Sequence, residues 1–206
     1  MKRYAFIDVL NTANTTEKML GYIVDWEKLT DYLMNKKSCT NVFLYTGIEN
    51  GDTDTAAEFA LLSKKDGCVV RSKPVFAYKN RDKKFSCKCP NCQTETISTI
   101  DMGYTKKSNC DVELGVDAIE RSGPDTELLI FTGDGDFEYL VRRALEKGVG
   151  KIQIFSYAGK EVWAGMTISR FSTKLRNLIA EKSDKVFYTS LLDIKNTIKK
   201  DLPNTA

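Results

Sequence analysis

The chain has 206 residues, of which 42% are hydrophobic and 29% are charged, a composition typical of one globular domain and not of a disordered or fibrous protein. Its net charge of +3, from 31 Lys and Arg against 28 Asp and Glu, is too small for a protein that binds nucleic acid through bulk charge. The absence of histidine excludes Ser-His and Cys-His catalytic pairs and histidine-ligated zinc hydrolases. An enzyme with this sequence must therefore use carboxylates, lysines or a bound metal ion.

The amino-terminal residues do not resemble a secretory signal, because the apolar run is short and reaches a carboxylate at Asp8. No apolar stretch approaches the ~20 residues that a membrane-spanning helix needs. We therefore expect a cytoplasmic protein that does not act at a membrane. In that compartment the six cysteines are expected to be thiols or metal ligands and not disulfides.

Strand-length apolar runs alternate with amphipathic stretches of helix length, which predicts an α/β fold with a central, mostly parallel sheet and helices on both faces. The expected strands are Arg3 to Asp8, Asn41 to Thr46, Gly67 to Arg71, Glu127 to Thr132 and Lys151 to Tyr157. The expected helices are Trp26 to Lys37 after an N-cap at Asp25, a helix from Asp52 or Thr53 through Lys65, Asp111 to about Arg121, and Phe137 to Lys147.

The alternation breaks between Pro74 and Asn109, where the sequence is polar, rich in lysine and contains cysteines. We interpret residues 74–109 as a small insert in a domain that spans residues 1–160. Residues 161–206 are expected to form an extension packed on the same domain, with a strand at Val186 to Tyr188 and a closing helix from Leu191 to Lys200.

Carboxylates follow two of the predicted strands. Asp8 ends the first strand, and Asp134 and Asp136 follow the strand that ends at Thr132. The carboxyl ends of strands in a doubly wound sheet form its ligand-binding edge, so these acids should meet there, with Gly133 and Gly135 allowing a tight turn. Asp111, at a helix start, can join them, whereas Asp117 lies about a third of a turn away around the helix.

Carboxylates crowded at one edge repel one another, and a hard divalent cation such as Mg²⁺ or Mn²⁺ supplies the counter-charge. The alternative for each acid is a helix cap or a turn residue, and Asp111 in particular could be only an N-cap. The combination of Asp8, Asp111, Asp134 and Asp136 favours a metal site suited to phosphoryl chemistry.

Three blocks of the sequence resemble the signature blocks of NYN domains in the PIN-like nuclease superfamily, most closely the LabA-like branch. The blocks are Phe6-Ile7-Asp8-x-x-Asn11, Asp111 to Ala118, and Phe131 to Phe137. The resemblance implies a PIN-like Rossmannoid fold, a three-layer sandwich, with metal-dependent ribonuclease activity. It makes Asp8, Asp111, Asp134 and Asp136 the metal-binding acids and Asn11 their polar partner. Asp117 matches a recurrent acidic position of the family.

Two positions depart from the family pattern. Val9 stands where the family often has Gly, and Ser108 stands where many members have Lys. Lys106 or Lys107 can compensate from nearby, and we expect both to bind substrate.

The insert contains Cys87, Cys89 and Cys92, and its Cys-Pro-x-Cys turn is typical of zinc knuckles. A structural zinc ion needs four ligands, so the fourth would be Cys68, Cys110, a carboxylate such as Glu95, or a residue of another chain. The alternative for Cys39, Cys68 and Cys110 is that they are buried and pack as small apolar residues. Zinc is therefore expected here as a structural ion, with a homodimer as one arrangement.

Lysines and arginines alternate with Phe76, Tyr78 and Phe85 in the insert, a pattern suited to binding single-stranded RNA through phosphate contacts and base stacking. The alternative is a solvated hairpin whose aromatic side chains pack on the domain. A second basic stretch, residues 167–185, contains Arg170, Lys174 and Arg176.

We therefore predict a metal-dependent ribonuclease that hydrolyses RNA at the cluster of aspartates. The alternative is a non-catalytic RNA-binding or regulatory module with the same fold, against which the complete set of acids argues. A phosphatase with an aspartyl nucleophile would need Asp-x-Asp after the first strand, and Asp8-Val9-Leu10 lacks it. DNA stays open as a substrate.

Overall fold

The structure, a computed structural model, describes residues 1–163 and 165–201, apart from the side chains of Lys107 and Trp163. Its main sheet has six strands that pair in parallel, in the order β12-β9-β8-β1-β2-β3. These strands are β1 (Lys2–Asp8), β2 (Asn41–Ile48), β3 (Cys68–Pro74), β8 (Thr126–Phe131), β9 (Lys151–Ser156) and β12 (Val186–Ser190). The predicted α/β class with a mostly parallel sheet is confirmed.

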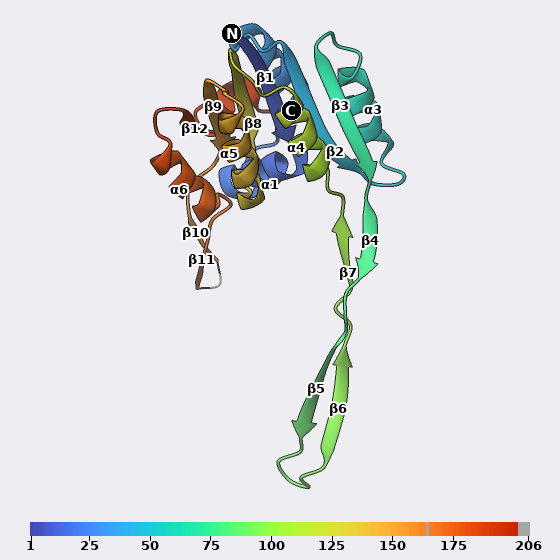
Figure 1. Cartoon of the computed structure of the whole chain (residues 1–206). Coiled ribbons are helices and arrows are strands. Elements are labelled where there is room, and N and C mark those ends of the chain that lie inside the picture. The colour runs from blue at the N-terminus through green and yellow to red at the C-terminus, as the bar shows by residue number, and fades with distance from the viewer. Residues whose placement is uncertain (164, 202–206) are drawn as a thin grey trace.

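Helices cover both faces of the sheet and make it the middle of three layers (Figure 1). One face packs against α1 (Val9–Leu20), α2 (Trp26–Asp31), the π-helical η1 (Tyr32–Lys36), α3 (Thr53–Leu62) and α7 (Lys195–Ile198). The other packs against α4 (Asp111–Glu120), α5 (Glu138–Glu146) and α6 (Thr173–Glu181). Side chains alternate between the two cores, with Ala5 and Ile7 in the first and Phe6 in the second.

Central strands are apolar on both faces because both are covered. All six residues of β8 are buried, as expected for a parallel strand between two helical layers. Burial on both faces produces the continuous apolar run from which this strand was predicted.

The helices differ from the expectations in three places, one of which is α6, a helix that the sequence did not predict. The segment of α1 shows no apolar period because threonines fill three of its four buried positions, Thr12, Thr15 and Thr16, and threonine also has a low helix propensity. The expected helix over residues 191–200 is wrong in extent, since only Lys195–Ile198 is helical. No helix in residues 1–163 and 165–201 is long and apolar enough to cross a membrane.

The insert forms a long arm, residues 76–107, built as a hairpin that extends away from the carboxyl end of the sheet (Figure 1). In its proximal half β4 (Phe76–Lys79) pairs with β7 (Tyr104–Lys107), and in its distal half β5 (Lys83–Lys88) pairs with β6 (Glu95–Ile100). Phe76, Tyr78 and Phe85 are 57%, 56% and 42% exposed. The alternative in which these rings pack on the domain is therefore wrong.

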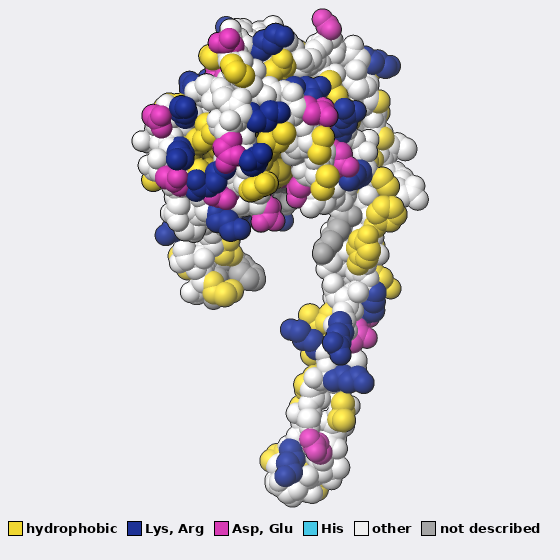
Figure 2. Space-filling view, viewed as in Figure 1, with side chains coloured by type: hydrophobic (Ala, Val, Ile, Leu, Met, Phe, Trp, Pro, Cys, Tyr) yellow, Lys and Arg dark blue, Asp and Glu magenta, His cyan; other side chains and the backbone are white. Residues whose placement is uncertain are grey.

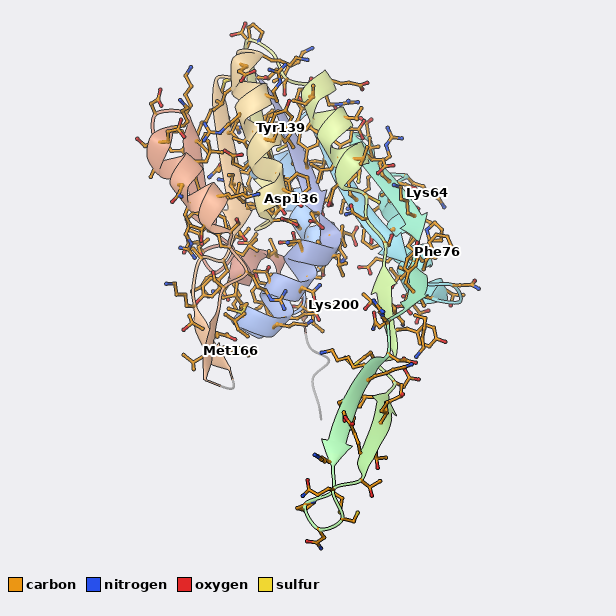
Figure 3. All side chains as sticks on the ribbon, turned by 60° about the horizontal axis from the view of Figure 1, so that its bottom comes forward. Lys64, Phe76, Asp136, Tyr139, Met166 and Lys200 are labelled. Carbon is orange, nitrogen blue, oxygen red and sulfur yellow. The ribbon has the colours of Figure 1, made fainter. Side chains whose placement is uncertain are left out.

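A second, short arm consists of β10 (Glu161–Trp163) and β11 (Met166–Ile168), paired in antiparallel fashion. The sequence did not predict it. Figure 3 shows Phe76 at the root of the long arm, Met166 at the end of the short arm and Asp136 on the body between them.

Candidate active site

The candidate site lies at the carboxyl ends of β1 and β8, which are neighbours in the sheet. From β1 the chain continues to β2 and β3 on one side, whereas β8 and the later strands lie on the other side. The strand order reverses between them, and this reversal opens a crevice in doubly wound folds. A cavity of about 400 Å³ lies there. Its polar lining consists mainly of Asp8, Asn11, Lys106, Ser108, Asn109, Asp111, Asp134 and Arg170.

Asp8 is the last residue of β1 and also the N-cap of α1, and these two positions fix its carboxylate. Its Oδ1 accepts a hydrogen bond from the N–H of Asn11 at 3.1 Å, and its Oδ2 accepts one from the Thr132 hydroxyl at 3.4 Å. The capping role and the site role therefore coincide in one residue.

The pKa of Asp8 is raised to about 6, mainly because burial disfavours the charged form. The hydrogen bond from Asn11 lowers the pKa, whereas the negative charges of Asp111 and Asp134 raise it further. Three carboxylates from separate elements thus interact electrostatically across the cavity. A cation placed among them would relieve this repulsion.

Asp134 follows β8 and caps the short 3-10 helix η2 (Gly135–Phe137). Its N–H donates to the Thr132 hydroxyl at 3.2 Å, and its Oδ1 accepts from the N–H of Asp136 at 3.0 Å. The Asp136 side chain itself is 82% exposed and lies 3.9 Å from the ammonium of Lys174. Asp134 lines the cavity, whereas Asp136 does not and instead lines a neighbouring pocket together with Asp111.

Asp111 is the first residue of α4, and its N–H donates to Oδ1 of Asn109 at 2.7 Å. Burial raises the pKa of its carboxyl, the Asn109 side chain lowers it, and the charges of Asp134 and Asp136 raise it. The N-cap of α4 is Cys110, which makes no side-chain cap hydrogen bond. The alternative in which Asp111 is only an N-cap is therefore wrong, and Asp111 lines the cavity.

The predicted substrate-binding residues fall in different places. Oδ1 of Asn11 accepts a hydrogen bond from the N–H of Gly133 at 2.9 Å, so Asn11 joins the β1 and β8 ends. Lys106 lines the cavity and pairs with Glu49 at 2.5 Å. The side chain of Lys107 lies outside the part of the chain that the structure describes.

Gly133 and Gly135 are needed for close packing and not for a left-handed backbone, which corrects the expected reason for their presence, since neither has a positive φ. A Cβ on Gly133 would lie 2.1 Å from the Arg170 carbonyl oxygen, and one on Gly135 would lie 2.3 Å from the Ser172 hydroxyl. The Ser172 N–H also donates to the Gly133 carbonyl at 2.9 Å. The segment after the short arm is thereby held against the loop after β8.

This packing brings Arg170 to the cavity. Its Nε is buried and has no hydrogen-bond partner among the residues that the structure describes. The sequence showed Arg170 only as one cation of a basic stretch, because its place depends on the short arm and on contact with Gly133.

The chemistry of the site suits a hard divalent cation. Its donors are carboxylate oxygens, and the negative charges of these carboxylates repel one another unless a cation lies between them. As they stand, however, no three Asp, Glu or Cys side chains in residues 1–163 and 165–201 are grouped closely enough to ligate one ion. Asp8, Asp111 and Asp134 are the residues that would hold it.

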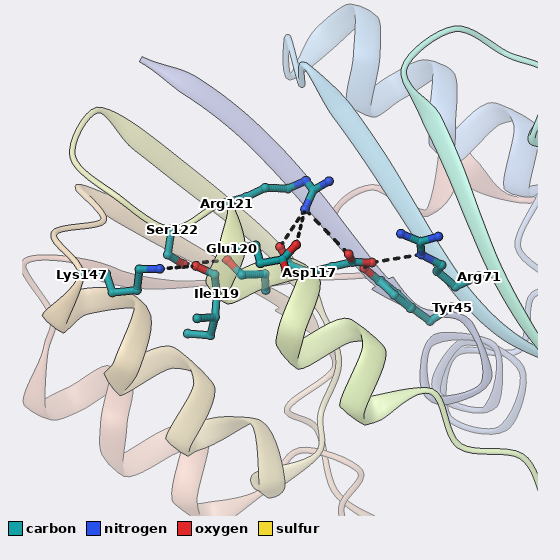
Figure 4. A network of polar contacts seen from close by, with 9 residues as sticks. Tyr45, Arg71, Asp117, Ile119, Glu120, Arg121, Ser122 and Lys147 are labelled. Atoms are coloured by element: carbon teal, nitrogen blue, oxygen red, sulfur yellow. Dashed lines mark hydrogen bonds and ion pairs between the residues drawn. The ribbon is translucent and has the colours of Figure 1, made fainter.

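Asp117 lies apart from the cavity, in a buried polar network on the other side of α4 (Figure 4). Its Oδ2 accepts from the Tyr45 hydroxyl at 2.9 Å and from Nε of Arg71 at 3.2 Å, and its Oδ1 lies 3.7 Å from Arg121. These contacts give Asp117 a structural role that does not involve the cavity.

The cysteines divide into two groups. Cys39, Cys68 and Cys110 are buried in the body of the protein, whereas Cys87 and Cys92 are exposed and Cys89 is half-buried at the tip of the long arm. Cys68 and Cys110 are therefore remote from the Cys-Pro-x-Cys turn.

Comparison with known proteins identifies the family. The model of the NYN domain matches residues 4–167, and no curated protein matches the sequence significantly. A protein of unknown function, VPA0982 from Vibrio parahaemolyticus, shares the fold with a TM-score of 0.58 and 16% identity over 96% of this chain and 95% of that chain. Phosphofructokinase-2 from Escherichia coli aligns with a TM-score of only 0.32 at 10% identity, over 57% of this chain and 37% of that one.

The family match covers most of the chain and includes β1, α4 and β8, the elements that carry the acids. NYN domains are nuclease-like and belong with the PIN-like superfamily, as the resemblance of the three sequence blocks implied. The match does not distinguish the LabA-like branch. The chain belongs to the NYN domain family.

Proposed function

We propose that this protein is a metal-dependent ribonuclease that hydrolyses phosphodiester bonds of single-stranded RNA. The observation that carries the proposal is the convergence of Asp8, Asp111 and Asp134 from three separate elements on one cavity at the switch point of the sheet. The raised pKa of Asp8, caused in part by the charges of the other two, supports it.

Asp8, Asp111 and Asp134, with Asp136 beside Asp111, would hold Mg²⁺ or Mn²⁺. Such an ion, when bound, activates water as a nucleophile and stabilises the leaving oxygen. Thr132 and the N–H of Asn11 hold the Asp8 carboxylate in place, and this orientation is what the chain itself contributes to the arrangement of the acids.

Two cations line the same cavity and would bind the phosphate of the substrate. Lys106 extends from the long arm, and Arg170 extends from the segment after the short arm. Arg170 is the stronger candidate for the reacting phosphate, because its buried Nε has no protein partner among the described residues and guanidinium binds phosphate oxygens in a fixed geometry.

The root of the long arm is suited to the bases of single-stranded RNA. Phe76 and Tyr78 are two positions apart on β4, so their side chains lie on the same face of the strand. Both line a neighbouring cavity of about 410 Å³. This cavity shares Ser108 and Asn109 with the acidic one. Exposed aromatic rings beside a basic, phosphate-accessible site are typical of single-strand binding, and Figure 2 shows basic and hydrophobic side chains interspersed along the arm.

The second candidate function is a non-catalytic RNA-binding module. The observation that favours it is the spacing of the acids, of which no three in the described residues lie within ligating reach of one point. Both candidates bind RNA, and the cysteines are free thiols. We therefore propose the cytoplasm as the compartment in which the protein acts.

The test is an assay of the purified protein on single-stranded RNA, double-stranded RNA and single-stranded DNA, with Mg²⁺, with Mn²⁺, or with EDTA. We expect cleavage of single-stranded RNA that needs the divalent ion. Binding of RNA without cleavage under all metal conditions would establish the second candidate instead.

A further inference from the structure

The tip of the long arm presents two thiols on an ordered turn. The Cys89 N–H donates to the Thr94 carbonyl at 2.9 Å, and the Gln93 N–H donates to the Cys89 carbonyl at 3.0 Å. Gln93 has a φ of 59°, so the loop closes through a left-handed residue, and the Cys92 thiol donates to the Thr94 hydroxyl at 3.2 Å. The turn that follows Cys89-Pro90 therefore has a defined hydrogen-bonded shape.

A closed zinc site cannot be completed within one described chain at this tip. Structural zinc takes four protein ligands, as cysteine thiolates or histidines, and the sequence has no histidine. The tip holds three cysteines, and Cys39, Cys68 and Cys110 are buried in the body, beyond the about 20 Å spanned by the six residues of β5. Glu95, the remaining candidate, is hydrogen-bonded to Ser86.

The distal half of the arm also lacks a packing partner in its own chain. β5 and β6 form a two-stranded sheet of their own, and an isolated two-stranded hairpin is at best marginally stable in water. Ile97 and Ile100 are nevertheless 71% and 49% exposed, and Phe85 is 42% exposed. A contact that links the tip of this arm to the tip of another copy would stabilise the two-stranded distal half.

We propose that two copies of this chain meet tip to tip and bind one zinc ion between them, through Cys89 and Cys92 of each copy. A tetrahedral site with four thiolates is then complete, and no ligand from the body of either protein is needed. The four thiol protons pass to the solvent when the ion binds.

Charge favours this arrangement. A zinc ion with four thiolates carries a net charge of −2, which the lysines of the two distal arms offset. The nearest of these is Lys88, exposed at the end of β5 next to Cys89, whereas Lys83 and Lys84 lie at the other end of the strand, about 17–20 Å away. The same lysines would repel one another without the intervening anionic centre, so the association should depend on the metal.

Cys87 lies one strand position away from the turn, opposite Thr96 in the hairpin. It shares a face with Phe85 and Ile100, because Lys83 pairs with Ile100 and side chains alternate along the strand. The proposal gives Cys87 no ligand role. It therefore provides the matched control for the two tip cysteines.

The experiment measures zinc content and mass in solution on the full-length protein purified without chelators. We expect one zinc ion per two chains and a dimer, which a chelator converts to monomers of half the mass. Cys89→Ser/Cys92→Ser should be monomeric, free of zinc and unchanged in circular dichroism, whereas Cys87→Ser should remain a zinc-bound dimer. Titration of the metal-free protein with Co²⁺ should reach its tetrahedral thiolate absorption at one ion per two chains.

Three results would overturn the proposal. One is a monomer with one zinc ion per chain, which would mean that the tip completes its site from one chain. Another is a dimer that survives both chelation and the double substitution. The third is the absence of zinc from protein refolded in its presence. The full-length protein's RNA cleavage plays no part in these measurements, so they are independent of the proposed nuclease activity.

Discussion

Oδ1 of Asn11 accepts a hydrogen bond from the backbone N–H of Gly133 at 2.9 Å. This bond joins the first turn of α1 to the loop after β8, and the two segments carry Asp8 and Asp134. The relative position of these acids therefore depends on this amide side chain together with the Thr132 hydroxyl, which bonds to both Asp8 and Asp134.

Replacing Asn11 by Ala should uncouple the two acids. We expect a loss of about 1 kcal/mol in the free energy of unfolding, typical of one hydrogen bond, and a roughly 10- to 100-fold loss of RNA cleavage, because small misplacements of reacting groups are costly. The matched control is Asn41→Ala at the amino end of β2, away from the cavity, where the side chain donates a hydrogen bond to the carbonyl of Gly67 at 3.4 Å. Equal losses in both variants would contradict the coupling.

Asp134→Asn separates a metal ligand from a helix cap. Asn can still accept the hydrogen bond from Asp136 N–H and caps about as well as Asp, while it removes a charge from a repulsive set. Without metal, the free energy of unfolding should hold or rise, and cleavage should fall by more than about 100-fold, since even residues that only support a ligand cost 10–100-fold. A stable variant with wild-type cleavage would remove Asp134 from the site.

Asp117→Asn should behave in the opposite way. It weakens the contacts of the buried Asp117 carboxylate to Arg71 and Arg121, so we expect a loss of about 2 kcal/mol in unfolding free energy, typical of hydrogen bonds to a charged group, and normal cleavage at temperatures where the variant is folded. Chemical denaturation with a parallel activity assay measures both. Loss of cleavage in a folded variant would show that Asp117 has a role at the site.

The raised pKa of Asp8, about 6 against an ordinary value of 3.8, predicts a pH-dependent stability. In metal-free protein the ionised form is disfavoured by folding, so Asp8 costs nothing below about pH 4 and its cost is complete above about pH 6, on the order of 3 kcal/mol. Asp8→Asn should therefore gain stability relative to the wild type as the pH rises from 4 to 7. Parallel unfolding profiles for the two proteins across that range would refute this assignment.

Arg170→Gln should lower kcat by about 100-fold, the scale for loss of one group that stabilises developing charge, with little change in unfolding temperature. Lys151→Gln is the control, since it removes a cation at the amino end of β9, away from the cavity. If Arg170→Gln changes only KM, then Arg170 binds the RNA chain and does not assist the reaction.

The sheet was predictable because its central strands are buried on both faces and read as apolar runs. Asp8 and Asp134 could be expected at one edge because the parallel strands that precede them end there, whereas Asp111 was expected there from its position at the start of a helix. Their distance from one another could not be predicted, because it depends on how α1, α4 and η2 begin, and each acid also has a local hydrogen bond to satisfy.

Arg170, the short arm and the long shape of the insert were not predictable from pattern. Arg170 lies at the cavity because its own carbonyl packs where Gly133 has no Cβ, a contact between segments far apart in the sequence. The long arm exposes its aromatic rings and so lacks the alternation between buried and exposed residues that marks a strand on a core.

The most direct test of the account is a titration with Mn²⁺, followed by electron paramagnetic resonance, on the same preparations whose cleavage of single-stranded RNA is measured. We predict saturable Mn²⁺ binding in the wild type that rises together with cleavage, and loss of both in Asp8→Asn and Asp134→Asn while Asp117→Asn retains both. Cleavage that persists in the two site variants, or Mn²⁺ binding that they leave unchanged, would contradict the assignment of these acids as the metal site.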